Sequence, residues 1–133
     1  MSFSLDLEID SRADKSHVLD ILRDMHFVMY DEGSDGVRGN FPGSNMYVVA
    51  RWVTEESEMP PRTEDSDFAK NWKIGVRASF YYVIGKQAQC SFEVNDFLSR
   101  LNEKSDAFFI LSFQMEKIYA IRDESGFRVV EKF

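Results

Sequence analysis

Cysteine is nearly absent from this 133-residue chain. Cys90 is the single cysteine, so the sequence excludes an intrachain disulfide and a metal site built from several thiolates. A reducing compartment fits this cysteine usage. Motifs of catalysis and phosphate binding are missing as well, among them HExxH, paired CxxC, the serine nucleophile elbow, GxGxxG and GxxxxGK[ST]. We therefore expect no catalytic residue, no cofactor and no metal, and we predict that the protein is not an enzyme.

Long apolar runs are also lacking. Nowhere do eighteen apolar residues follow one another, as a membrane-spanning helix would require. The opening stretch MSFSLDLEIDSR places Asp6, Glu8 and Asp10 between its apolar residues, and it has neither the basic region nor the continuous apolar run of a signal peptide. We expect a cytoplasmic protein that does not bind a membrane.

Basic residues are too few to balance the acidic ones. Sixteen Lys and Arg stand against twenty-three Asp and Glu, for a formal net charge of -7. Such a charge repels phosphate backbones and attracts cationic partners. The composition thus argues against nucleic-acid binding and favours a partner with a basic surface.

Apolar and aromatic residues, in contrast, are plentiful. Hydrophobic residues make up 44% of the chain, and twelve Phe, five Tyr and two Trp favour a core of bulky side chains. This length and composition predict a single domain over residues 1–133.

The clearest local pattern lies between Trp72 and Ile84. Every second residue is apolar, which places Ile74, Val76 and Phe80 on one face of an extended strand. The residues between them are mostly polar at the start of the stretch, where they include Lys73 and Arg77. This alternation predicts a central strand with one face on the core and one wet face.

Similar patterns predict the other elements. Alternation from Phe3 to Ile9 indicates a half-buried strand, and an amphipathic helix capped by Ser11 or Asp14 follows it. A second helix is predicted after Ser91, and residues 31–45 form a turn-rich loop that could contain a hairpin. The remaining extended runs are Phe27–Tyr30, Met46–Val53, Phe108–Gln114, Glu116–Arg122 and Phe127–Val130. This order predicts an α+β fold, a mainly antiparallel sheet with two helices packed on one face.

Carboxylates gather in two stretches that the predicted elements leave as loops. The larger group is Glu55, Glu56, Glu58, Glu64, Asp65 and Asp67, and the smaller is Asp31, Glu32 and Asp35. In the larger stretch only Arg62 opposes the acids, and Pro60-Pro61 prevents regular strand pairing. Two interpretations follow: a solvated run of charges, or a docking surface for a basic partner.

Aromatic and basic residues next to these stretches suggest further contacts. Trp52 and the Tyr81-Tyr82 pair could serve as aromatic anchors in an interface. Arginines on a concave sheet face, Arg51 and Arg77, could instead hold a small anionic ligand.

Taken together, these features resemble a known group of proteins, the small acidic cytoplasmic immunity proteins of bacterial contact-dependent growth inhibition and other polymorphic toxin systems. The resemblance rests on the compact α+β chain, the lone cysteine, the missing catalytic motifs, and the loops YDEGSDG and EESEMPPRTEDSD. It implies binding to one cognate toxin domain and occlusion of that toxin's active site, without turnover. No residue role is carried over.

A type III-like secretion chaperone is the main alternative. Such chaperones are also small, acidic and α+β, but they typically begin and end with helices and form dimers. This chain begins with the predicted strand SFSLDLEI and ends with FRVVEKF. A small protein that binds an anionic ligand remains the third alternative.

Overall fold

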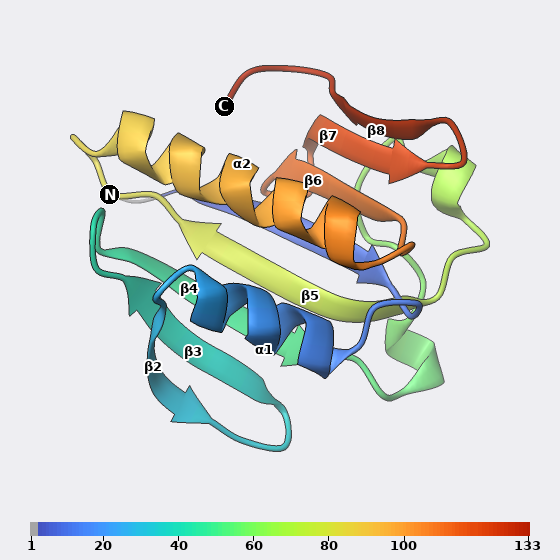
Figure 1. Cartoon of the computed structure of the whole chain (residues 1–133). Helices are drawn as coiled ribbons and strands as arrows, with labels where there is room; N and C mark the ends of the chain where they lie inside the picture. Colours follow the sequence, from blue (N-terminus) through green and yellow to red (C-terminus); the bar gives the residue numbers. More distant parts are fainter. Residues whose placement is uncertain (1–2) are drawn as a thin grey trace.

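The computed structural model describes residues 3–133 and has one eight-stranded sheet with two α-helices. In chain order the elements are β1 (Ser4–Asp10), α1 (Lys15–Asp24), β2 (Val28–Glu32), β3 (Gly36–Phe41), β4 (Met46–Trp52), the 3₁₀ turns η1 (Glu56–Glu58) and η2 (Asp67–Ala69), β5 (Ile74–Tyr81), α2 (Gln87–Lys104), β6 (Phe109–Phe113), β7 (Lys117–Asp123) and β8 (Gly126–Val129). The strand order is β2-β3-β4-β5-β1-β6-β7-β8, and every pairing is antiparallel. Both helices lie across the same face of the sheet (Figure 1). The predicted α+β fold is confirmed.

Strands β5 and β1 form the middle of the sheet. Their register pairs Leu5 with Phe80 and Ile9 with Val76, and all four side chains are buried under the helices. The predicted apolar face of β5 is therefore confirmed over the strand itself. The predicted strand is too long at its end, because β5 stops at Tyr81, and Ile84 in the following turn is 65% exposed.

The first helix forms as its sequence predicts. Asp14 is the N-cap, and its carboxylate accepts hydrogen bonds from the backbone N–H groups of Ser16 and His17. Its apolar stripe faces the sheet and buries Val18 and Leu22 among others. Among residues 3–133, no helix has both the length and the apolarity needed to cross a membrane.

The second helix begins earlier than predicted. It starts at Gln87, so Ser91 lies inside its second turn and is not a cap. The Ser91 hydroxyl instead contacts the Tyr82 hydroxyl at 3.2 Å, while Cys90 and Val94 face the core. The cap prediction for Ser91 was wrong because the hydroxyl has a tertiary partner.

The predicted loop over residues 31–45 contains a strand. Strand β3 pairs with both β2 and β4 and forms a hairpin with each. A Cβ atom at Gly39 would lie 2.0 Å from the Val28 carbonyl oxygen and 2.7 Å from the Phe27 ring, so only glycine fits there. The glycines that favour a loop in the sequence instead permit close packing of this strand.

The side of the sheet opposite the helices, here called the second face, is only partly open. The β4–β5 connection (residues 53–73) packs over its middle, where Glu8 and Arg77 are both buried. The predicted wet face of β5 was therefore wrong at Arg77. A distant segment covers a position that the strand alone would leave in water.

Candidate functional site

The nine carboxylates predicted to bind a partner are on the surface. Glu58 is half-buried, and the other eight are exposed: Asp31, Glu32, Asp35, Glu55, Glu56, Glu64, Asp65 and Asp67. The larger group lies in the acidic segment, defined here as residues 55–67, which includes η1 and the start of η2. Its charges are thus presented by a segment without regular strand or α-helix.

Backbone hydrogen bonds attach the β4–β5 connection to the sheet at several points. Val53 N–H donates to the Gly75 carbonyl at 2.9 Å where the connection leaves β4. Ile74 N–H donates to the Met59 carbonyl at 2.8 Å, which ties the segment to the start of β5. Glu64 N–H donates to the Met115 carbonyl at 2.7 Å in the β6–β7 turn. The β4–β5 connection therefore spans the second face from the end of β4 to the β6–β7 turn.

A buried ion pair lies beneath the acidic segment. The Arg77 guanidinium contacts the Glu8 carboxylate through Nε and through Nη2, each at 3.0 Å from Oε2. Burial lowers the pKa of Arg77 below its ordinary value, and the nearby Glu8 charge opposes that shift. An arginine stays protonated even with such a shift, so the buried guanidinium keeps its charge.

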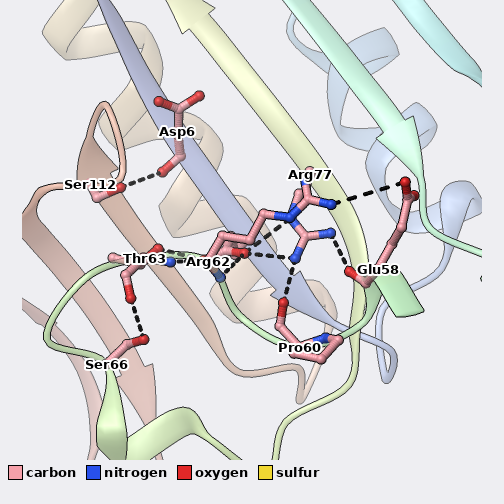
Figure 2. Close-up of polar contacts among 9 residues, drawn as sticks. Asp6, Glu58, Pro60, Arg62, Thr63, Ser66, Arg77 and Ser112 are labelled. Atoms are coloured by element: carbon pink, nitrogen blue, oxygen red, sulfur yellow. Dashed lines mark hydrogen bonds and ion pairs between the residues drawn. The ribbon is translucent and has the colours of Figure 1, made fainter. Parts of the chain in front are cut away.

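The remaining polar atoms of this pair hold the segment's backbone (Figure 2). Glu8 accepts hydrogen bonds from Arg62 N–H at 2.9 Å and from Thr63 N–H at 3.0 Å, and from the Thr63 hydroxyl. Arg77 donates to the carbonyl oxygens of Pro60, at 2.7 Å, and Glu58. The chain around Pro60-Pro61 cannot pair as a strand, and these side chains supply the hydrogen bonds that a strand neighbour would otherwise give.

The smaller acidic group lies on the β2–β3 hairpin. Two of its carboxylates form ion pairs with arginines: Asp31 is 3.0 Å from Arg38, and Glu32 is 3.6 Å from Arg23. The Asp35 carbonyl accepts a hydrogen bond from Trp52 N–H at 2.9 Å, immediately before the connection begins. This hairpin and the start of the acidic segment therefore lie at the same end of the sheet.

The acidic segment does not keep all its charges at that end. Glu55 and Glu56 lie three and four residues after the end of β4, whose last residue Trp52 is bonded to the hairpin, whereas Glu64 is bonded to the β6–β7 turn. That turn follows Phe113, which pairs with Leu5 at the opposite end of the central strands. The structure thus places the start of the acidic segment at the same end of the sheet as Asp35, and it carries Glu64 toward the other end.

Two aromatic residues lie on the open part of the second face, at the end of β4 and β5 away from Trp52 and the start of the acidic segment. The rings of Tyr47 and Tyr81 are 5.8 Å apart on neighbouring strands, and Tyr81 is 36% exposed. Trp52 is half-buried, and Tyr82 is buried on the helix side, so Tyr82 cannot anchor a partner on this face. Among the predicted aromatic anchors, Tyr81 is the accessible one.

A hollow of about 310 Å³ borders the β2–β3 hairpin and β4. Its lining includes carboxylates, Asp31 and Asp35, as well as the arginines Arg38 and Arg51. Arg77 is not part of the lining, because Glu8 and the carbonyls of the acidic segment occupy its guanidinium. The arginine pair predicted to hold an anionic ligand is thus reduced to Arg51 beside two carboxylates.

Glu8 and Arg77 are the residues of this site that the sequence pattern does not single out as a pair. The available signal is one carboxylate and one guanidinium in the middle of two strongly alternating strands. Each fits an ordinary polar strand face, so only the register that sets Glu8 opposite Arg77 reveals the pair.

Other chemistry-bearing residues have structural partners. Cys90 is buried in the core, and His17 closes the cap of α1, since its Nδ1 lies 3.2 Å from Asp14 N–H. Over residues 3–133 no three His, Cys, Asp or Glu side chains form a group that could hold a metal ion.

Comparison of the chain with protein-family models, with curated proteins and with solved structures finds no match.

Proposed function

We propose that this chain is an immunity-type inhibitor that binds a cognate toxin domain through the acidic segment and occludes the toxin's active site. The observation that carries the proposal is the attachment of an exposed acidic segment to the sheet through the buried Glu8–Arg77 pair. The proposal includes no turnover and no cofactor, and it places the protein in the cytoplasm with its toxin.

Support comes first from preorganisation. Most exposed loops lose conformational entropy when they bind a partner. Here four hydrogen-bonded backbone groups, at Glu58, Pro60, Arg62 and Thr63, are already fixed by buried side chains. The segment therefore pays less ordering entropy on association than a free loop of the same length.

Charge gives the second support. Glu55, Glu56, Glu64, Asp65 and Asp67 are exposed. Their field attracts a basic protein surface and accelerates its association. A toxin that acts on nucleic acid carries such a basic surface at its active site, so an acidic inhibitor blocks the same surface that its substrate needs.

The test begins with the reading frame next to this one in its genome. The proposal expects a toxin domain there, and co-expression of this chain should protect cells from it. The purified toxin domain should form a stoichiometric complex with this chain. A neighbouring toxin that neither binds this chain nor is neutralised by it would contradict the proposal.

The role of the acidic segment is tested with a fourfold neutralised variant, Glu55→Gln, Glu56→Gln, Glu64→Gln and Asp65→Asn. Its association rate with the toxin should fall at least about tenfold at low ionic strength. The difference should shrink in about 1 M salt, where screening acts over about 3 Å. Folding should be preserved, since exposed substitutions usually change stability by less than about 0.5 kcal/mol.

A matched control carries the same charge change elsewhere. Asp20→Asn, Glu103→Gln, Asp106→Asn and Glu124→Gln neutralise four other exposed carboxylates. This control should retain nearly all of the association rate. Equal losses in both variants would show that net charge acts without a specific docking surface.

A further inference from the structure

A second cavity lies on the helix side of the sheet, away from the acidic segment. Its volume is about 290 Å³. It is lined by Phe3, Leu5, Tyr82, Gln87, Ala88, Ser91, Tyr119 and Phe133. These residues come from the first turns of α2, from the neighbourhood of β1 and β5, from β7 and from the last residue of the chain.

Aromatic rings dominate this cavity. Phe3 packs against Tyr82 with ring centroids 5.3 Å apart, and Tyr119 stacks on Phe133 at 5.8 Å with an angle of 3° between the rings. Phe113 links the two pairs, at 5.6 Å from Phe3 and 6.5 Å from Tyr119. Rings in such walls offer both faces and edges to an aromatic guest.

Backbone hydrogen bonds hold these walls in place. Tyr82 N–H donates to the Phe3 carbonyl at 3.0 Å, and Val130 N–H donates to the Tyr119 carbonyl at 2.7 Å. Glu131, two residues before Phe133, also pairs with Lys117 of β7 at 2.9 Å. The last residues are thereby kept beside β7, with the Phe133 ring over Tyr119.

The polar side chains that line the cavity are uncharged. None of the eight lining side chains carries a formal charge at neutral pH. The hydroxyls of Tyr82 and Ser91 face each other at 3.2 Å. Burial raises the pKa of Tyr82 to about 12, so its hydroxyl stays protonated and can donate a hydrogen bond. A charged guest would lose water without finding an opposite charge.

We propose that this cavity binds a small neutral aromatic molecule with two fused rings and one hydrogen-bonding substituent. The volume supports two rings, because a 150 Å³ apolar cavity holds one benzene and this cavity measures about 290 Å³. The Tyr82–Ser91 hydroxyl pair meets the substituent. This site is independent of the proposed inhibitor function, since it lies on the other face of the sheet.

The experiment titrates the folded chain with 2-naphthol, indole and 2-naphthoate while following its aromatic and methyl NMR signals. The two neutral probes should give saturable shifts at Tyr82, Tyr119, Phe133 and the Ala88 methyl group. The charged 2-naphthoate should bind at least tenfold more weakly. Unsaturated or scattered shifts with both neutral probes at millimolar concentration would overturn the proposal.

Two variants on α2 localise the binding. Ala88 lines the cavity yet is exposed, so Ala88→Leu should narrow the cavity without unfolding the protein. The affinity for both neutral probes should fall at least tenfold. Ser99→Leu makes a similar change at an exposed position of the same helix outside the cavity and should leave binding unchanged. Equal affinities in the two variants would place the probes elsewhere.

Two further comparisons test the chemistry of the guest. Tyr82→Phe keeps the ring and removes the hydroxyl. It should therefore reduce the affinity for 2-naphthol at least threefold more than it reduces the affinity for unsubstituted naphthalene. N-acetyl-tryptophanamide, which represents an aromatic side chain of a protein partner, should bind more weakly than indole. A tenfold preference for N-acetyl-tryptophanamide would assign the cavity to a partner's side chain and overturn the small-molecule proposal.

Discussion

Glu8 and Arg77 stand opposite each other on β1 and β5, with their charged groups 3.0 Å apart and their side chains 0% and 5% exposed. Both project from the second face of the sheet, where the acidic segment covers them. The same two side chains bind the sheet together and hold the backbone of that segment. The candidate docking surface therefore depends on two residues that a partner would never touch.

Replacing Arg77 with alanine should destabilise the protein by about 3 to 5 kcal/mol, because it leaves the Glu8 carboxylate buried without its counter-charge. Chemical denaturation measures this loss. Hydrogen exchange at the amides of Arg62 and Thr63 should also accelerate, since Glu8 then draws water toward the segment. Arg62→Ala is the control. That side chain is exposed, and its ion pair with Glu58 is long, at 4.0 Å, so its loss should cost little stability. If Arg77→Ala costs less than about 1 kcal/mol, the pair does not hold the segment.

Placing an aspartate at Val76 should unfold the domain. The side chain is 1% exposed in the apolar layer under the helices, where a carboxylate finds no partner and its burial costs several kcal/mol. Tyr81→Asp, at an exposed position of the same strand, should retain a cooperative transition. Circular dichroism during thermal unfolding checks both variants. A Val76→Asp melting temperature within a few degrees of the parent would argue against this core.

Removing the Asp14 cap should cost about 1 kcal/mol at neutral pH, as N-cap replacements by alanine usually do. Hydrogen bonding to Ser16 is the main cause that lowers the pKa of Asp14 from 3.8 to about 2. A lowered folded-state pKa means that the contribution is present above about pH 3.8 and is lost as pH falls toward 2. The difference in free energy of unfolding between the parent and Asp14→Ala should therefore disappear over that pH range. Ser99→Ala, at an exposed position that carries no carboxylate, should show no such pH-dependent difference.

Alkaline pH should lower the stability of the protein because Tyr82 is buried. Burial raises its pKa from 10.0 to about 12, so between these values the unfolded chain has lost a proton that the folded chain keeps. Stability then falls as pH rises from about 10 to 12. Tyr82→Phe should lose less stability over this interval than the parent. Melting temperatures at pH 8, 10 and 11 test this, and parallel curves for the two proteins would contradict it.

Local periodicity was enough to predict the core elements. In β1, β5 and α1 the apolar spacing matches the period of a strand or a helix, so each segment reveals its buried face by itself. Strand β3 and the start of α2 were missed for a common reason. Gly39 and Ser91 carry loop and cap signals, but their roles depend on Phe27 and Tyr82, which only the folded chain places beside them.

For the candidate site, the sequence by itself determined that carboxylates cluster in two stretches with turn-forming residues, and such stretches are exposed because they have no apolar face to bury. Only the tertiary structure decided how those stretches are held. Arg77 and Glu8 are 69 positions apart, and Arg62 is 54 positions from Glu8. On its own, each of the charged side chains Glu8 and Arg77 favours water, since an isolated charge is costly to bury. Their burial became favourable because three distant segments met in the fold, so that each charge gained the other as a partner and both gained hydrogen bonds to the acidic segment.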